Sequence, residues 1–252
     1  MKRFFFYPLF ITTLFIFSCS IATHRSRNYI PPRPVPTDAI KTHVLVAQLI
    51  YNEEDELIGH SHGCGSIIND NGQRVYVLTA GHVVETRRLL PDHAHHLNLA
   101  VRLSADGEWI PARVERRQED LDAAIISFPS SPLRQFHMLP IAEEDPEIGD
   151  IIWGIGSPSY AFRMFIHRVI AGRCGRDIPC RCCTGNQVCW TLDGPAWPGF
   201  SGGAAVNRDG ELVGIIVALH MFSPNRDPAS GVIISLSTLR PLISDFLPNG
   251  QE

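Results

Sequence analysis

A serine set among glycines is the strongest candidate for covalent chemistry in this chain. Ser201 stands at the centre of GFSGG (199–203), a pattern typical of a nucleophile on a tight turn. A serine nucleophile needs a base to take its proton and a carboxylate to hold that base in the right tautomer. His82 follows the apolar run RVYVLTA, and Asp122 stands just before the run AAIISF. These three residues therefore suit a nucleophile, a base and an orienting acid.

Two aspartates compete for the role of the orienting acid. Asp120 and Asp122 lie two residues apart, ahead of the same apolar run. Asp122 alternates with Ala124 and Ile126, so it lies on the same face of the predicted strand as they do. We favour Asp122 and keep Asp120 as the alternative.

The glycines around Ser201 also fit a second architecture. Gly-x-Ser-x-Gly is the nucleophile elbow of α/β-hydrolases, which need a parallel sheet, alternating helices, and an acid and a histidine after the serine. Only His220 follows Ser201 among the histidines, and the chain shows no alternation of strands and helices. This architecture is therefore disfavoured.

The sequence pattern predicts that β-strands and one helix position these residues. Short runs of β-branched and aromatic residues recur between turn signals, and the chain holds 20 Gly and 19 Pro. Asn-Gly at 71–72 and Asp-Gly at 209–210 predict tight hairpins. We expect about six strands before Pro129, about five after Asp150, and a helix over 237–247 that Ser237 caps.

Several motifs in chain order resemble the trypsin-like serine proteases, and among these the protease domain of the bacterial HtrA branch. The resemblance covers about residues 44–247 and implies an all-β fold of two antiparallel six-stranded β-barrels with a C-terminal helix. The segments that carry it are GCGSII (63–68), TAGHVV (79–84), DAAII (122–126), EIGDIIWGIGSPS (147–159), GFSGG (199–203), GELVGIIVA (210–218) and the closing GVIISLSTLRPLI.

The resemblance implies an endopeptidase that works through an acyl-enzyme intermediate on protein or peptide substrates. His82 is then the general base, Asp122 its orienting acid and Ser201 the nucleophile. The backbone N–H groups of Gly199 and Ser201 form the oxyanion hole, and Gly199 suits that position because it lacks a Cβ. Asp193, eight residues before the serine, is expected to have a structural role.

The resemblance also places the primary specificity pocket. No acid stands where trypsin itself binds Lys or Arg, so an apolar, partly filled pocket should prefer small aliphatic residues before the cut. The residues expected to border this pocket are Val217, Ala218 and Leu219, with Pro195 to Pro198 as the opposite wall.

Phe200 departs from the family pattern. In trypsin-like zymogens the residue before the serine is an Asp that pairs with a newly cut N-terminal ammonium. Phe200 offers no charge, so we expect activity without zymogen cleavage and a turn shaped by the packing of Phe200.

A second departure concerns the C-terminal end. The sequence ends shortly after Leu247, so we expect none of the peptide-binding domains that usually follow an HtrA protease domain. The rival hypothesis is a catalytically silent protease-fold binding or scaffold lipoprotein, which would not need all three residues of the triad.

The first residues indicate export and a lipid anchor. A basic start and the apolar run FFFYPLFITTLFIF are typical of a secretory signal peptide. The segment IFSC resembles a bacterial lipobox, which makes Cys19 the lipidation site and an outer-membrane lipoprotein facing the periplasm or the cell surface the expected location; a plain signal peptide is the alternative. The expected segments are 1–18 signal peptide, 19–43 Pro-rich tether, 44–247 protease domain and 248–252 tail.

The net charge and the histidine pattern argue against nucleic acid, cofactors and metals as ligands. The formal net charge of −4 gives no electrostatic case for binding nucleic acid. We expect no cofactor and no metal, and we interpret the HAHH segment, with His93, His95 and His96, as a solvated loop rather than a metal site.

Five clustered cysteines admit two interpretations, zinc binding or disulfides. Their spacing lacks the paired C-x2-C knuckles of common zinc sites, and export favours an oxidising compartment. The resemblance puts the strand of Cys64 near the catalytic serine, so we expect three disulfides, two within the cysteine-rich loop and one from Cys64 to that loop. The cysteines of the loop are Cys174, Cys180, Cys182, Cys183 and Cys189.

Overall fold

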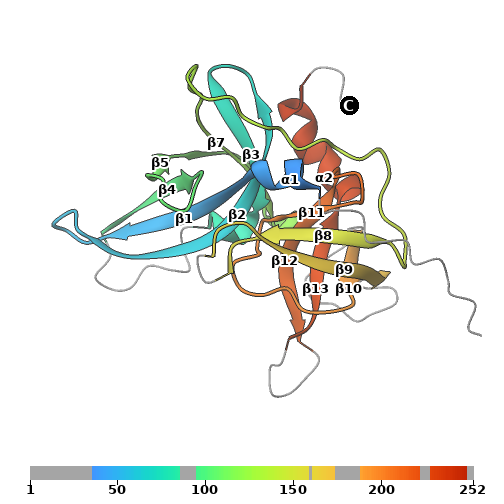
Figure 1. Ribbon diagram of the computed structural model, residues 1–252. Helices are drawn as coiled ribbons and strands as arrows, with labels where there is room; N and C mark the ends of the chain where they lie inside the picture. Colours follow the sequence, from blue (N-terminus) through green and yellow to red (C-terminus); the bar gives the residue numbers. More distant parts are fainter. Residues whose placement is uncertain (1–35, 86–94, 159–160, 174–187, 222–227, 249–252) are drawn as a thin grey trace, which may run out of the picture. The chain divides into compact units, whose positions relative to one another are not determined.

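The computed structural model describes residues 36–85, 95–158, 161–173, 188–221 and 228–248, without the side chains of 218–229 (Figure 1). These residues belong to a compact unit that begins at Pro34. Two antiparallel β-sheets dominate it, which confirms the predicted all-β class. None of the helices in the described ranges is long and apolar enough to span a membrane.

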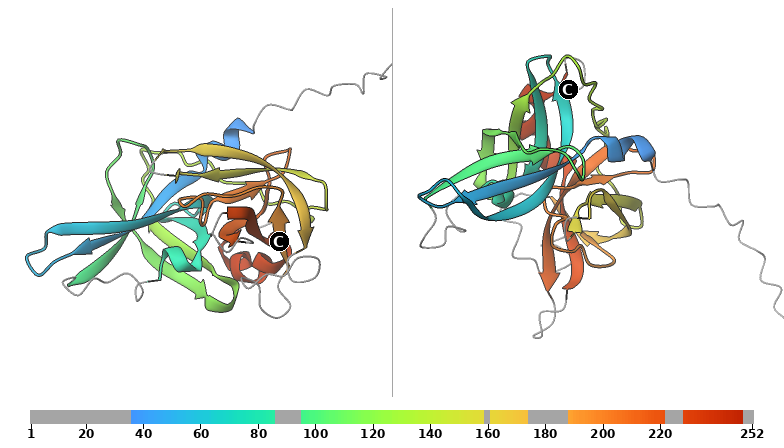
Figure 2. Two further views of the ribbon diagram at one scale, coloured as in Figure 1. Left: turned by 90° about the horizontal axis from the view of Figure 1, so that it is seen from below. Right: turned by 60° about the vertical axis from the view of Figure 1, so that its left-hand side comes forward.

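The first sheet has seven strands in the order β5-β4-β1-β2-β3-β7-β6 and is open between β5 and β6 in the described residues, where the sequence predicted a six-stranded barrel. Figure 2 shows its long β1–β2 hairpin extending beyond the neighbouring strands. The strands are β1 (His43–Tyr51), β2 (Leu57–Asp70), β3 (Arg74–Ala80), β4 (His96–Arg102), β5 (Ile110–Pro111), β6 (Arg113–Gln118) and β7 (Ala123–Pro129).

The second sheet closes into a six-stranded barrel in the order β10-β13-β12-β11-β8-β9, as predicted. Its strands are β8 (Ile151–Gly156), β9 (Met164–Arg173), β10 (Cys189–Leu192), β11 (Ala204–Val206), β12 (Leu212–Met221) and β13 (Pro228–Ser235). One continuous apolar core contains buried side chains from both sheets, among them Ile125, Phe128, Ile155 and Ile215. Burial of this shared core holds the two sheets together.

The two predicted Gly-containing turns are present. Gly72 has φ +82° between β2 and β3, and its N–H binds the Asp70 carboxylate (2.9 Å). Gly210 has φ +83° between β11 and β12. Both glycines take a left-handed conformation that most other residues avoid, which is why these dipeptides mark hairpins.

The C-terminal helix differs in detail from the prediction. Helix α2 spans Leu236–Ile243, and Ser235, not Ser237, caps it by accepting the Thr238 N–H (3.3 Å). Ser237 lies in the first turn, where its N–H and hydroxyl both bind Asp145 (2.9 and 2.5 Å). A 3-10 turn, η4 (Ser244–Phe246), follows α2. The helix contacts β7, β12 and β13, so it packs against both sheets.

Part of the segment expected to be a tether is folded. Helix α1 spans Thr37–Lys41, and Thr42 and His43 after it are buried. Two further 3-10 turns flank the candidate residues. η1 (Gly81–Val83) follows β3 and contains the candidate base, His82. η2 (Glu119–Leu121) precedes β7 and ends just before the candidate acid, Asp122.

Candidate active site

Strand pairing brings His82 and Asp122 to the same edge of the first sheet. Ala80, the last residue of β3, pairs with Ala123, the first residue of β7. His82 lies two residues beyond that pair on one strand and Asp122 one residue before it on the other. The Gly81 N–H also binds the Asp122 carbonyl (2.7 Å), which closes this edge.

The carboxylate of Asp122 binds His82 through both of its oxygens. Oδ2 lies 2.7 Å from the ring Nδ1 of His82, and Oδ1 accepts the backbone N–H of the same residue at 2.7 Å. An ionised carboxylate only accepts hydrogen bonds, so Nδ1 carries the hydrogen and Nε2 keeps its lone pair. The ring is thereby held in the tautomer that a general base needs. The acid that holds His82 is Asp122 rather than its rival Asp120.

The backbone of Asp122 takes an unusual conformation that aims this carboxylate. Its φ of +48° and ψ of +42° lie in the left-handed region, directly after η2. Aspartate and asparagine tolerate that region better than most residues because their short side chains bond locally. Asp122 therefore suits both the turn and the partner it binds.

The segment before Ser201 forms a tight turn. The Phe200 N–H binds the Trp197 carbonyl (3.0 Å), Pro198 is the second residue and Gly199, with φ +95°, the third. This combination is typical of a type II turn. Neither Gly199 nor Ser201 donates its N–H to a backbone carbonyl of a described residue. Within the described chain, the two predicted oxyanion-hole donors therefore have no backbone acceptor.

The turn is bonded to both sheets. The carbonyl of Gly199 accepts the N–H of Ser157, after β8, at 3.0 Å and the thiol of Cys64, in β2, at 2.9 Å. The carbonyl of Ser201 accepts the N–H of Cys64 at 2.7 Å. These bonds fix how the peptide groups of the turn are oriented.

The two glycines after the serine let the chain pass between the sheets. A Cβ at Gly202, which has φ +81°, would overlap the Cys64 carbonyl oxygen, and one at Gly203 would overlap the Ile155 carbonyl oxygen. Only residues without a side chain fit both positions, which gives the Gly-Gly of GFSGG a steric reason.

Ser201 and the segment of His82 meet at Gly63 in β2. A Cβ at Gly63 would lie 2.5 Å from a methyl of Val83, the residue after His82, and 2.8 Å from the carbonyl oxygen of Ser201. No hydrogen bond joins the hydroxyl of Ser201 to His82 within the described residues. In proteins free of substrate this bond is often long and tightens only on binding.

Phe200 is fully buried below the turn. Its ring occupies the space where a side chain at Gly156, the last residue of β8, would stand. The ring centroid of Trp197 lies 6.4 Å away. The residue before the serine is therefore held by apolar packing. The role of Gly156 in admitting this ring has no signal in the sequence.

The predicted wall of the specificity pocket has a brace that sequence reasoning missed. The carbonyl of Pro195 accepts two hydrogen bonds from Arg168 in β9, at 3.2 Å from Nε and 2.8 Å from Nη2. The same guanidinium lies 5.5 Å from the ring centroid of Trp197, within range of a cation–π contact. Of the residues predicted for the other side of the pocket, Val217 is buried, whereas the side chains of Ala218 and Leu219 lie outside the described part of the chain. Arg168 therefore fixes this wall.

Asp193 has the structural role predicted for it. Its Oδ1 accepts the N–H of Val169 (3.0 Å), and its own N–H binds the carbonyl of that residue. The two bonds join the end of β10 to β9.

The predicted disulfide from Cys64 is wrong. Cys64 is a free, buried cysteine whose thiol binds the Gly199 carbonyl. Burial raises the pKa of this thiol to about 12, so it stays protonated. Cys189 is disulfide-bonded. The other cysteines of the prediction, together with the lipidation site, lie outside the described residues: Cys19, Cys174, Cys180, Cys182 and Cys183.

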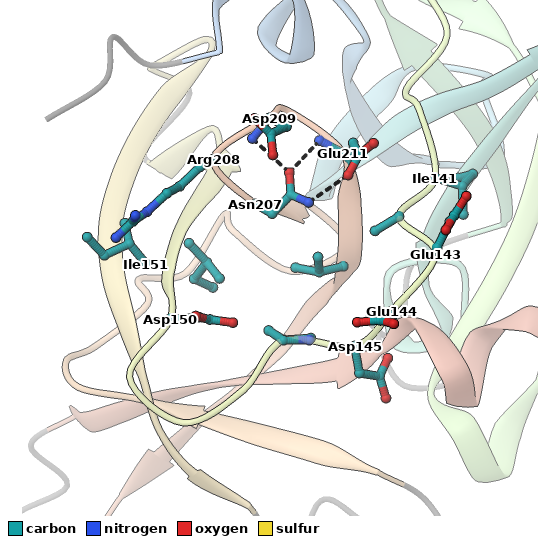
Figure 3. Close-up of a pocket in the computed structure, with 14 residues that line it drawn as sticks. Ile141, Glu143, Glu144, Asp145, Asp150, Ile151, Asn207, Arg208, Asp209 and Glu211 are labelled. Carbon is teal, nitrogen blue, oxygen red and sulfur yellow. Dashed lines mark hydrogen bonds between the residues drawn. The ribbon is translucent and has the colours of Figure 1, made fainter.

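A cavity of about 570 Å³, to which none of the triad residues contributes, has six acidic residues among the fourteen that line it (Figure 3). Several of these carboxylates serve the fold. Asp145 binds Ser237, Asp150 accepts the N–H of Glu147 (2.8 Å), and Glu211 accepts the side-chain amide of Asn207 (2.8 Å). None of the residues that line it belongs to the candidate active site.

Comparison with known families agrees with this geometry. Residues 63–215 match the family model of the trypsin-like peptidase domain, which spans more than half of the chain. The chain belongs to this family.

Curated relatives extend the likeness over most of the chain. This chain is 23% identical over 195 residues to the protein named "Serine protease HtrA-like" of Staphylococcus aureus strains USA300 and NCTC 8325. The match covers 75% of this chain and 24% of the relative. The chain thus spans about a quarter of the length of these curated relatives.

Two solved structures share the fold. The serine endoprotease from Yersinia pestis gives a TM-score of 0.59 at 22% identity, covering 86% of this chain and 68% of that one. The active form of the Rv3671c protease from M. tuberculosis gives 0.61 at 18% identity, covering 84% and 83%. These likenesses confirm the trypsin-like fold.

Proposed function

We propose that the chain is an exported, HtrA-type serine endopeptidase that acts through His82, Asp122 and Ser201. The observation that carries this proposal is the pair of 2.7 Å hydrogen bonds between the Asp122 carboxylate and His82. A silent scaffold has no need for a histidine held in this one tautomer at the edge of the serine turn.

The reaction follows from the roles of these groups. Ser201 Oγ attacks the substrate carbonyl carbon while His82 Nε2 takes the hydroxyl proton. The N–H groups of Gly199 and Ser201 stabilise the negative oxygen that forms. His82 then gives its proton to the leaving amine, which breaks the peptide bond and leaves an acyl group on Ser201. Water, deprotonated by the same ring, then attacks this ester; the carboxylic acid product leaves as the ring returns the proton to Ser201 Oγ.

Labelling with a fluorophosphonate probe tests the proposal. The purified full chain should label at Ser201 and cleave a casein-type substrate. Ser201→Ala should abolish labelling, and His82→Ala should lower kcat by about 10⁴-fold or more, with unchanged unfolding curves. Folded wild-type protein that neither labels nor cleaves would favour the scaffold hypothesis instead.

We propose further that the protease needs no activating cleavage. The buried packing of Phe200 on Gly156 supports this, since it supplies an internal anchor for the turn where zymogens use a new N-terminus. Protein that begins at Cys19 should label at once. Labelling that starts only after a cut near residue 44 would contradict the idea.

The expected cleavage preference is for small aliphatic residues before the scissile bond. A buried Val217 and a wall fixed by Arg168 support a small, apolar pocket. A peptide library read by mass spectrometry should show this preference, and a strict requirement for Arg or Lys would contradict it.

We propose that lipid on Cys19 holds the protein at the outer membrane of the bacterial envelope. Cys19→Ala should release it from the membrane fraction and remove metabolic palmitate label. A wild-type protein that stays in the membrane without any label would argue for an uncleaved anchor.

A further inference from the structure

The residue that donates its N–H to the Gly199 carbonyl lies beyond the end of a strand. Ser157 follows β8, and the last pair between β8 and β9 joins Gly156 to Met164. The N–H of Ser157 binds the Gly199 carbonyl at 3.0 Å. Strand pairing alone therefore does not orient Ser157, although the serine turn depends on its N–H.

The side chain of Ser157 supplies the missing restraint. Its hydroxyl accepts the backbone N–H of Arg163 (3.3 Å) and forms a hydrogen bond of 2.9 Å with Nε2 of His43. Ser157 also interacts with the thiol of Cys64, the second donor to Gly199. The serine is fully buried, so bulk water does not compete for these bonds. The bond to His43 connects Ser157, which follows a strand of the second sheet, to the first sheet.

His43 is itself held in place by the fold. It is the first residue of β1, where it pairs with Ser66 of β2, and its side chain is fully buried. The ring of Phe162 packs edge-on against it at a centroid distance of 5.7 Å. Burial, together with the positive charge of Arg163, lowers the pKa of His43 to about 3, so the ring is neutral near pH 7. A fixed, neutral imidazole can therefore determine where the hydroxyl of Ser157 lies.

Gly199 needs hydrogen bonds to its carbonyl because its own backbone is permissive. A residue without a Cβ can adopt several conformations, of which the φ of +95° seen here is one. The bond from Ser157 restricts this freedom at a residue whose own N–H is a predicted oxyanion-hole donor. Preorganised donors stabilise the transition state, so a loss of order at Gly199 should lower kcat more than it changes substrate binding.

We propose that His43 is a positioning residue for the oxyanion turn, residues 197–201. Its imidazole holds the hydroxyl of Ser157, and the N–H of Ser157 holds the carbonyl of Gly199. The inference rests on the proposed protease function, and His43 itself touches no reacting atom. A residue that the sequence assigned to the tether thus contributes to the active site from within the folded domain.

Two substitutions of His43 separate its hydrogen bond from its packing. Leucine fills a similar volume but cannot bond Ser157, whereas the amide of glutamine can both donate and accept. One hydrogen bond between neutral groups shifts an equilibrium by up to about tenfold. Because Ser157 keeps its bond from the Arg163 N–H, His43→Leu should lower kcat about three- to tenfold with KM unchanged. His43→Gln should recover most of that loss.

A peptide boronic acid measures the same effect at equilibrium. It forms a tetrahedral adduct on Ser201 that resembles the transition state, so its affinity should fall in His43→Leu by the same factor as kcat. A double-mutant cycle with Ser157→Ala then tests the route. If both residues act through one bond, adding His43→Leu to Ser157→Ala should change kcat by less than about twofold.

Thr42→Val is the matched control. Thr42 is the adjacent buried residue, and its hydroxyl bonds the Ala39 carbonyl (2.8 Å) rather than any part of the oxyanion turn. This variant loses one buried hydrogen bond in the same segment, so it should lower stability but keep the kcat and the boronate affinity of the wild type.

Amide hydrogen exchange read by mass spectrometry tests the positioning without catalysis. The N–H of Phe200, which binds the Trp197 carbonyl, should exchange faster in His43→Leu than in Thr42→Val. If the wild type neither labels nor cleaves, the protease function fails, and this exchange still decides whether His43 orders the turn.

Three results would overturn the proposal. The first is folded His43→Leu with the kcat and the exchange rate of the wild type. The second is an equal loss of kcat in Thr42→Val, which would show a general effect of destabilisation. The third applies even if His43→Leu does not fold: Ser157→Ala with the kcat and boronate affinity of the wild type would show that this hydroxyl positions nothing.

Discussion

Replacing Phe200 by alanine separates the stability of the serine turn from its shape. The side chain is fully buried on Gly156, and removal of a buried phenylalanine side chain costs about 3–5 kcal/mol. In a domain of this size each kcal/mol lowers the unfolding midpoint by about 2–4 °C, so we expect a fall of about 6–20 °C. If the ring also sets the turn, the labelling rate of Ser201 should fall in protein that is still folded.

Phe128→Ala is the matched control. Phe128 lies in β7, is equally buried, and packs edge-on against Phe136 at a centroid distance of 5.6 Å. Its loss should cost a similar free energy of unfolding but leave the turn untouched. Both variants would be compared by urea unfolding and by the fluorophosphonate labelling rate, at a temperature where each is folded.

One result would refute the reasoning. If Phe200→Ala loses as much stability as Phe128→Ala yet labels Ser201 at the wild-type rate, the ring contributes only burial. The turn must then be shaped by its other bonds, such as those to the Gly199 carbonyl.

Three further predictions concern single titratable groups. Asp122→Asn should lower kcat by about 10⁴-fold, because an amide can stabilise the wrong tautomer, whereas Asp120→Asn should leave it nearly unchanged; asparagine tolerates the left-handed backbone, so steady-state kinetics can be read without a folding defect. Burial raises the pKa of Cys64 from 9.0 to about 12, so the unfolded chain loses this proton first and stability should fall as the pH rises above about 9. Cys64→Ser should lack that part of the slope in urea unfolding at pH 8 and pH 10. His43 has its pKa lowered from 6.5 to about 3, so the unfolded chain binds this proton first and stability should fall as the pH drops below 6.5. A shallower loss between pH 7.5 and pH 5 in His43→Gln would support this, and an identical loss in both proteins would contradict it.

The pairing of His82 with Asp122 could be foreseen from the sequence because it depends on where strands end. Each residue lies next to a strong apolar run, and the pairing of Ala80 with Ala123 brings the two strand ends together. The hairpin turns at Gly72 and Gly210 could also be predicted, since their left-handed conformation excludes most other residues.

Contacts between distant segments could not be foreseen in the same way. The family resemblance predicts a disulfide for Cys64, but its buried thiol donates to the carbonyl of Gly199, 135 residues away in the chain. His43 was placed in a tether because of the prolines before it, although Ser157, 114 residues later, gives it a buried partner. An arginine in a strand, such as Arg168, carries no signal of the carbonyl it will bind. Composition and periodicity describe local chain preferences, whereas these partners are set by tertiary packing.

The bonds to the Gly199 carbonyl have a consequence for how the two halves of the fold depend on each other. One donor, Cys64, belongs to the first sheet, and the other, Ser157, follows a strand of the second. Neither half alone can hold the peptide group that precedes the serine. A chain cut in the connector between β7 and β8 should therefore yield two fragments that are inert apart and label when recombined. Any change that separates the two sheets would therefore inactivate Ser201 without altering that residue.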